Sequence, residues 1–268
     1  MRNTAIIVLF LCLAAGCKKE ENSEFTDTPI IESYLEPGSA MNVKVSRQIP
    51  FSSDVSYSSD NIDALNVNVL YNGTTYPLSP LGGGQYTNSS LIVTEGGEYT
   101  LSFNYNNKNV SAQTYIPSKP LNYTQSVTQI AIARMDSTSG PPSSGVTMPD
   151  PVTLSWTNTD GSYYIVLIEN IETTLDPIRD FGDATPPGNR FRKTPTNSSS
   201  VEIRAQEFQY YGTHRLLLYH VLPDYASLYN QSSTSSQNLT NPSTSITNGY
   251  GIFTGMNADT LMIEVTEQ

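Results

Sequence analysis

Cysteine and histidine are almost missing from this sequence, and their scarcity excludes several kinds of site. Only two cysteines occur, Cys12 and Cys17. Cys12 lies in an apolar leader that we expect to be removed, so a single thiol remains. A disulfide bond and a cysteine metal cluster both need more than one thiol. The mature fold is therefore expected to be stabilised by burial alone.

The two histidines are His214 and His220, six positions apart on an expected strand. At about 3.3 Å per residue they would lie roughly 20 Å from each other. They cannot bind one metal ion together there, and we expect both to be half-buried strand residues. No His-Glu-x-x-His, glycine-serine elbow or phosphate-loop motif is present in the sequence. The sequence thus indicates no cofactor and no known catalytic motif.

Charge is also sparse and biased in sign. Charged residues make up 15% of the chain, and 25 acidic residues face 14 Lys and Arg, a net charge of −11. This balance argues against nucleic acid as a partner, because phosphates are bound by Lys and Arg. Ser, Thr, Asn, Tyr and Gly are common, and no long helical periodicity occurs. Together these features predict an all-β protein.

The first residues read as an export signal. Arg2 precedes an apolar run over residues 5–15, which is typical of a signal peptide and shorter than the roughly 20 residues of a spanning helix. The string "LAAGC" resembles a bacterial lipobox, which implies removal of residues 1–16 and lipidation, including palmitate, on Cys17. The following "KKEE" resembles the signal that exports Bacteroidota lipoproteins to the outer face of the outer membrane. The alternatives for the apolar run are an ordinary signal peptide with an incidental cysteine and a buried apolar segment. For the charges that follow, in residues 17–28, the alternative is a plain solvated tether.

Residues 29–117 show short strands and tight turns. In "MNVKVS", residues 41–46, apolar and polar side chains alternate, which indicates a strand with one buried face. The pairs at 72–73 (Asn-Gly) and 106–107 (Asn-Asn) favour tight hairpin turns. These signals predict an antiparallel β-sandwich of immunoglobulin-like size. The proline-rich stretch 116–120 is expected to end it.

Residues 118–268 are predicted to form a second antiparallel sandwich. We expect strands at 121–135, on both sides of Asp160-Gly161, and at 200–208, 213–221 and 260–265, with a short helix in "PDYASLYNQSS". The segment "PVTLSWTNTDGSYYIVLIEN" resembles the B and C strands of a fibronectin type III module, where a tryptophan packs into the core. That role falls to Trp156. The predicted architecture is two tandem sandwiches, immunoglobulin-like and then fibronectin type III-like.

Several segments, in this order, resemble a family of Bacteroidota lipoproteins known as domain of unknown function 4249. The matching pieces are the lipobox, "IIESYLEPG", "VKVSRQIPF", "GGEYTLSF", "VSAQTYIP", "YASLYN" and "NGYGIF". Residues 171–200 contain no motif that we can match. The resemblance implies a surface lipoprotein encoded beside TonB-dependent outer-membrane receptors. It implies no catalytic residue.

Tyrosine is the strongest indication of binding, because its ring stacks on sugars and packs against protein partners. In each adjacent pair, one ring is expected to point into the core. In "NGYGIF" the glycines permit a bend that presents an aromatic ring, or a bulge whose Tyr250 and Phe253 complete the core. The candidate ligand or partner contacts are Tyr210, Tyr211, Tyr225, Tyr229 and Tyr250.

A loop with three acidic residues, Asp176, Asp180 and Asp183, leaves three interpretations open. It could bind calcium, which takes six to eight oxygen ligands, although its spacing is not that of an EF-hand. It could supply a glycosidase carboxylate pair. It could also consist of solvated acids paired with neighbouring cations, namely Arg179, Arg190, Arg192 and Lys193.

The sequence therefore favours a noncatalytic lipoprotein on the cell exterior. We expect it to assist a TonB-dependent receptor by binding an extracellular glycan or peptide. A surface adhesin or structural spacer is the alternative, and a surface hydrolase is a third. Two short segments, at Ser137 and Thr260, resemble the Bacteroidota O-glycosylation motif.

Overall fold

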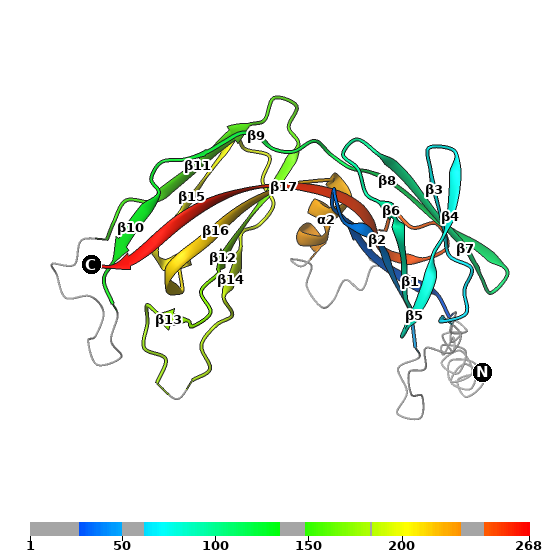
Figure 1. Ribbon diagram of the computed structural model, residues 1–268, viewed down its shortest axis with the longest axis horizontal. Coiled ribbons are helices and arrows are strands. Elements are labelled where there is room, and N and C mark those ends of the chain that lie inside the picture. The colour runs from blue at the N-terminus through cyan, green and yellow to red at the C-terminus, as the bar shows by residue number, and fades with distance from the viewer. Residues whose placement is uncertain (1–26, 50–61, 135–147, 183, 232–243) are drawn as a thin grey trace, which may run out of the picture.

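The computed structural model describes residues 27–49, 62–134, 148–182, 184–231 and 244–268. It is an all-β structure of two lobes that form an arch (Figure 1). The first lobe comprises the described residues between 27 and 115 and the first part of the last strand, β17 (Tyr250–Glu267). The second comprises the described residues between 121 and 231 and the rest of that strand. No helix in the described ranges has the length and apolar content that crossing a membrane requires.

The first lobe is a sandwich of two sheets. One has the order β1-β2-β6-β5 and the other β4-β3-β7-β8. Their inner faces enclose one apolar core, in which Ile31, Tyr86 and Leu101 are fully buried. The strands are β1 (Pro29–Leu35), β2 (Ala40–Arg47), β3 (Asn68–Tyr71), β4 (Thr74–Pro77), β5 (Ser79–Gly82), β6 (Gln85–Ile92), β7 (Glu98–Tyr105) and β8 (Lys108–Tyr115).

Both predicted hairpin turns are confirmed. Asn72 and Gly73 have φ of 49° and 74°, and Asn106 and Asn107 have φ of 47° and 61°. Two successive positive φ values are typical of a type I′ turn, which Asn and Gly tolerate best. The turns join β3 to β4 and β7 to β8, so the register of both hairpins is set locally.

The second lobe also has two sheets around one core. A three-stranded sheet, β15-β11-β9, faces the sheet that contains β14-β12-β16-β17. Trp156 lies in this core as predicted, with its ring centroid 5.4 Å from that of Tyr164. The elements are β9 (Leu121–Gln125), β10 (Gln129–Ile132), β11 (Val152–Thr157), β12 (Tyr163–Asn170), β13 (Asp176–Pro177), β14 (Arg190–Arg192), β15 (Ser200–Ile203), η2 (Ala205–Glu207), β16 (Tyr210–Val221), α2 (Pro223–Gln231) and β17 (Tyr250–Glu267).

The single strand predicted at 121–135 is in fact two strands in different sheets. β9 pairs with β11, whereas β10 pairs in parallel with β17. The change occurs at Ser126, whose N–H donates to the carbonyl of Thr153, and Thr128, whose carbonyl accepts from Glu264. The chain therefore passes from one sheet to the other within three residues. The short helix expected near residue 223 is confirmed as α2.

The strand β17 joins the two lobes (Figure 1). Its first six residues pair in parallel with β1, and residues 256–265 pair antiparallel with β16. One continuous sheet therefore runs through both lobes. The predicted domains, 29–117 and 118–268, place Ile246 and Phe253 in the second domain. In the structure, both side chains belong to the core of the first lobe.

Gly251 explains why β17 can lie so close to β1. Its φ is +99°, and a Cβ built on it would lie 1.9 Å from the carbonyl oxygen of Ile31. Glycine alone fits that conformation and that distance. Of the two alternatives for "NGYGIF", the structure supports completion of the core by Phe253, whose side chain is fully buried. Tyr250 is half-buried at the start of the strand.

Candidate functional site

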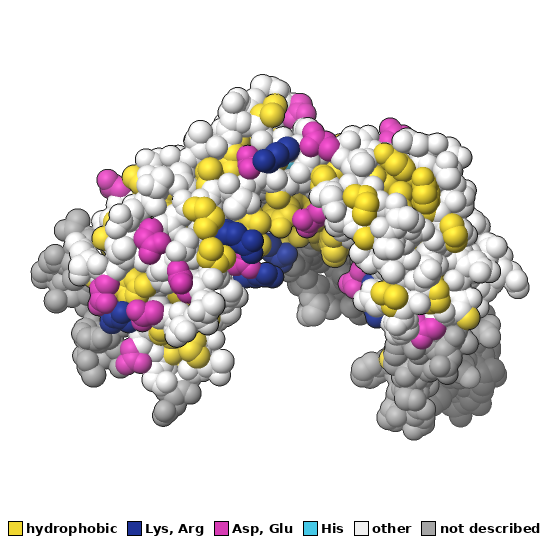
Figure 2. Space-filling view, in the orientation of Figure 1, with side chains coloured by type: hydrophobic (Ala, Val, Ile, Leu, Met, Phe, Trp, Pro, Cys, Tyr) yellow, Lys and Arg dark blue, Asp and Glu magenta, His cyan; other side chains and the backbone are white. Residues whose placement is uncertain are grey.

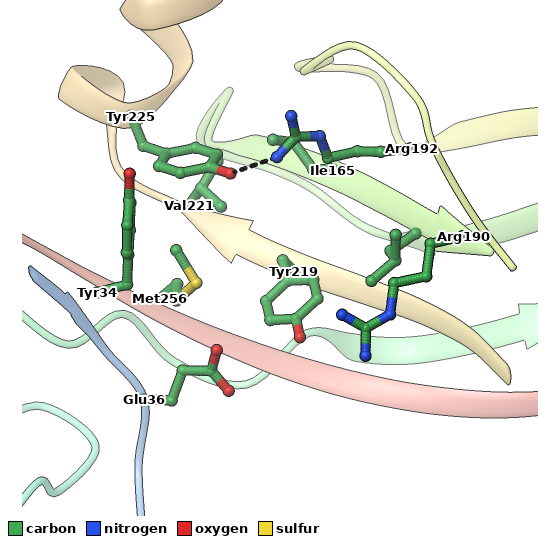
Figure 3. Close-up of a pocket in the computed structure, with 10 residues that line it drawn as sticks. Tyr34, Glu36, Ile165, Arg190, Arg192, Tyr219, Val221, Tyr225 and Met256 are labelled. Atoms are coloured by element: carbon green, nitrogen blue, oxygen red, sulfur yellow. Dashed lines mark hydrogen bonds between the residues drawn. The ribbon is translucent and has the colours of Figure 1, made fainter. Parts of the chain in front are cut away.

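A pocket of about 630 Å³ lies between the lobes, under β17. Figure 2 shows Lys and Arg side chains beside hydrophobic ones in the hollow beneath the arch. The volume is within the range typical of small-molecule sites. Both lobes contribute to the lining, which consists of Tyr34, Glu36, Ile165, Leu167, Arg190, Arg192, Tyr219, Val221, Tyr225 and Met256 (Figure 3).

The floor of the pocket is apolar because the central sheet has two covered faces. On β12, Val166 and Ile168 point into the core of the second lobe, and Ile165 points to the opposite face. There Ile165 packs with Val221 of β16 and Met256 of β17, and all three are buried. Tyrosines from β12, β16 and α2 pack against this cluster. The floor thus offers a ligand a surface made of apolar side chains.

One side of the pocket is a group of arginine and tyrosine side chains. Arg192 donates from Nη1 to the hydroxyl of Tyr225 over 3.2 Å, and its guanidinium lies 5.1 Å from the ring centroid of Tyr229. Tyr34 of the first lobe meets Tyr225 edge-on at 5.8 Å. Burial raises the pKa of Tyr34. Burial is also the larger cause, and a hydrogen bond with Tyr225 the smaller one, that raises the pKa of Tyr229 to about 12. The hydroxyls of Tyr34 and Tyr229 therefore stay neutral at physiological pH.

The second arginine of the pocket is already neutralised. Glu169, with only 6% of its side chain exposed, accepts from Arg190 Nε at 2.6 Å and from Arg215 Nε at 2.9 Å. Burial alone would raise the pKa of Glu169, and the two arginines together bring it below its ordinary value. Arg190 is thereby held in the wall of the pocket with much of its charge compensated.

Glu36 differs from Glu169 because it has no cation beside it. It follows β1 and is half-buried. Burial raises the pKa of its carboxyl. Among the described residues no Lys, Arg or His lies within ion-pair distance of it. Figure 3 places it across the pocket from Arg192.

Comparison with known protein families identifies the family of this chain. A family model described as a domain of unknown function, DUF4249, matches residues 19–261. The chain belongs to the DUF4249 family. A search of curated proteins found no match. Among solved structures, the DUF4249 chain is similar to a mutant of Salmonella alpha-2-macroglobulin at 12% identity and a TM-score of 0.25, over 91% of this chain. It spans only 15% of that protein, and so low a score supports no inference.

Two of the predicted tyrosines lie at the pocket of this DUF4249 chain. Tyr225 lines it, and Tyr229 extends the same aromatic wall into a neighbouring depression. Tyr210 and Tyr211 require a correction, since both are buried, at 2% and 7% exposure. Their hydroxyls donate to main-chain carbonyls, that of Tyr211 to Ile132 over 3.0 Å. That end of β16 is covered on both faces, so neither ring is available to a ligand.

The predicted acidic loop is not a cluster of three carboxylates in the described residues. Asp176 forms a two-bond ion pair with Arg134, at 2.9 and 3.0 Å. Asp180 accepts from the N–H of Gly182 in a turn, and Asp183 lies outside the described residues. No group of three His, Cys, Asp or Glu in the described ranges is placed to hold a metal ion.

Two of the four cations expected to pair with that loop bind elsewhere. Arg190 pairs with Glu169, and Lys193 pairs with Glu207 at 2.5 Å. The partner of Asp176 is instead Arg134, two residues after the end of β10 and 42 positions away in the sequence. Arg134 also binds Glu267 at 2.8 Å and lies 4.7 Å from the ring centroid of Tyr211.

The two histidines share a face of β16 as expected, but they are more buried than predicted. His214 is 2% exposed and His220 9% exposed. One ring nitrogen of each lies 2.9 Å from a main-chain oxygen, of Gly212 and Ser118 respectively. These contacts give both rings a structural role.

The sequence did not indicate Tyr34 and Glu36 as site residues, and it indicated Arg192 only as an expected partner of the acidic loop. They come from opposite lobes, and no local pattern shows that they meet. The alternation in Arg190-Phe191-Arg192 was the available signal, because it places two cations on one face of a strand. Of the predicted modification sites, Cys17 and Ser137 lie outside the described residues, and Thr260 is exposed on β17.

Proposed function

We propose that this chain is a lipid-anchored, noncatalytic protein of the outer cell surface. It binds a small extracellular nutrient, a glycan or a peptide, and passes it to a TonB-dependent outer-membrane receptor. The observation that carries the proposal is the pocket between the lobes, where an apolar floor meets tyrosine rings and Arg192, which has no carboxylate partner within the described part of the chain. Pockets of this composition, with a few polar groups, are typical of ligand sites.

The anchor is supported by the sequence "LAAGC" ending at Cys17 and by the charges that follow it. Several acyl chains on one cysteine give stable membrane attachment, whereas one chain gives only marginal attachment. Membership of the DUF4249 family, together with the resemblance of this sequence to Bacteroidota lipoproteins, supports a cell-surface location and a receptor as partner.

A binding function is favoured over hydrolysis by the chemistry of the lining. The described residues around the pocket include no serine, cysteine, threonine or histidine. Glu36 is the one carboxyl among them, whereas a glycosidase requires two carboxyl groups about 5–10 Å apart. The pocket therefore suits recognition.

A rigid spacer or adhesin is the second candidate, and one observation favours it. The continuous sheet through both lobes would resist bending between them. Such a protein would need no receptor, whereas the uptake proposal requires one.

Affinity purification of the tagged, lipidated chain from gently solubilised outer membranes separates these functions. We expect a TonB-dependent receptor in near-equal amount. Recovery of the chain alone, under conditions that preserve other receptor complexes, would contradict the uptake proposal and favour the spacer. A Cys17→Ser variant is the control. It should incorporate no labelled palmitate and leave the membrane fraction.

A further inference from the structure

Two charged side chains on opposite sides of the pocket, Arg192 and Glu36, have no partner of opposite sign among the residues that the structure describes (Figure 3). Arg192 makes one hydrogen bond, to the hydroxyl of Tyr225, and stacks on the ring of Tyr229. None of the carboxylates that the structure describes lies within ion-pair distance of it. Glu36 lies across the pocket (Figure 3), and no cation in the described ranges is within ion-pair distance of it either. The other charges nearby are satisfied within the Glu169 group.

An unpaired charge in a half-enclosed site indicates what the ligand must supply. A guanidinium offers a planar set of N–H donors that matches a carboxylate. A carboxylate acceptor matches an ammonium group in the same way. Because the two groups lie across one pocket, a single ligand that carries both charges would satisfy both.

The surface between the two charges restricts the ligand further. Ile165, Val221 and Met256 form its floor, and these side chains offer a sugar hydroxyl no donor and no acceptor stronger than a thioether sulfur. Burying an apolar group on this floor would contribute about 25 cal/mol per Å². A ligand with an apolar body therefore gains more here than a neutral glycan, whose hydroxyls would lose water.

We propose that the pocket binds short peptides as zwitterions. The carboxylate lies at Arg192, the amino group lies at Glu36, and an apolar side chain packs on the floor between them. This inference rests on the proposed function, that the chain captures a nutrient here, and it names the class of nutrient. A neutral glycan supplies neither charge, and an acidic glycan supplies only one.

The experiment uses the full chain, solubilised in detergent and immobilised, at pH 7.5. One probe is a peptic digest of casein restricted to short peptides, and the other is a pool of neutral and uronate-containing oligosaccharides. Mass spectrometry identifies what is retained. We expect peptides to be retained, and retention to fall about tenfold in Arg192→Gln and in Glu36→Gln.

Matched controls separate a local effect from a change in net charge. Arg179→Gln and Glu98→Gln remove the same charges at exposed positions outside the lining, and they should retain peptides like the unmodified chain. Arg192→Lys keeps the charge but not the planar donor set, so we expect partial retention. Circular dichroism of each variant verifies that it folds.

Blocking the two ends of a retained peptide assigns each end to a residue. N-acetylation of the peptide should weaken its binding to the unmodified chain about tenfold. In the Glu36→Gln variant, the same acetylation should weaken binding no further. C-terminal amidation should show the same dependence on Arg192. Such non-additivity is expected only of groups in direct contact.

Each other outcome overturns the inference. Retained peptides that are insensitive to both blocked ends would exclude the proposed orientation. Retention of oligosaccharides alone would overturn peptide binding and leave the capture function standing. Retention of neither pool would overturn the inference and also remove the support for capture.

Discussion

Truncation of Phe253 to alanine tests whether one strand joins the two lobes energetically. The side chain belongs to β17 but lies fully buried in the core of the first lobe. A buried Phe→Ala change typically lowers the free energy of unfolding by about 3–5 kcal/mol. With a urea dependence of about 1–3 kcal/mol per molar, the midpoint should fall by roughly 1 M or more.

Two probes make this measurement decisive. Trp156 is the sole tryptophan of the chain and lies in the core of the second lobe, so its fluorescence reports on that lobe. Far-UV circular dichroism reports on both lobes. If β17 couples them, Phe253→Ala should shift both transitions together, although the mutation lies in the first lobe. Met262→Ala, at an exposed position of the same strand, should change either midpoint little.

Two results would refute this reasoning. A midpoint that falls by circular dichroism but not by Trp156 fluorescence would show that the lobes unfold separately. A change below about 1 kcal/mol in both probes would place Phe253 outside the core, because a buried aromatic ring contributes more than that.

The other predictions concern backbone conformation and pH. Gly251→Ala should lower the free energy of unfolding by more than about 3 kcal/mol, because strain at positive φ of about 1–2 kcal/mol adds to the clash with Ile31. Gly96→Ala should cost only the strain, since no atom lies within 4 Å of the added Cβ. Urea titration of both variants checks this. Burial raises the pKa of Glu36, so ionisation destabilises the native state. Glu36→Gln should therefore unfold at higher urea than the unmodified chain at pH 7, and at equal urea at pH 4. Burial lowers the pKa of His214, so its ring should remain neutral by NMR below pH 6.5. The free energy of unfolding should then fall as the pH drops through 6.5, because the unfolded chain takes up the proton first.

Local patterns predicted most of the strands because alternation and turn chemistry are local. The alternation at residues 41–46 gave β2, and Asn72-Gly73 gave the β3–β4 hairpin. The partners of β17 were not predictable in this way. Its first half is buried on both faces, so it lacks alternation, and parallel pairing with β1 leaves no hairpin signal.

The site shows the same limit. Aromatic content indicated Tyr225 and Tyr229, yet it also selected Tyr210 and Tyr211, because composition does not distinguish a buried ring from an exposed one. Arg192 meets Tyr225 and Tyr229 only after β14 and α2 have packed in the second lobe, and Glu36 comes to the same pocket from the first lobe. Which charges lack partners is a property of the folded chain, and no spacing in the sequence expresses it.

The position of β17 has a consequence for how the chain folds. This strand follows all the others in sequence, yet it lies at the centre of the sheet and completes both cores. Its contacts with β1 join residues that are nearly as distant in sequence as this chain allows. Such long-range pairing slows folding. Neither lobe can reach its final packing until β17 has been added, so partly synthesised chains would have incomplete cores that remain open to chaperones and proteases.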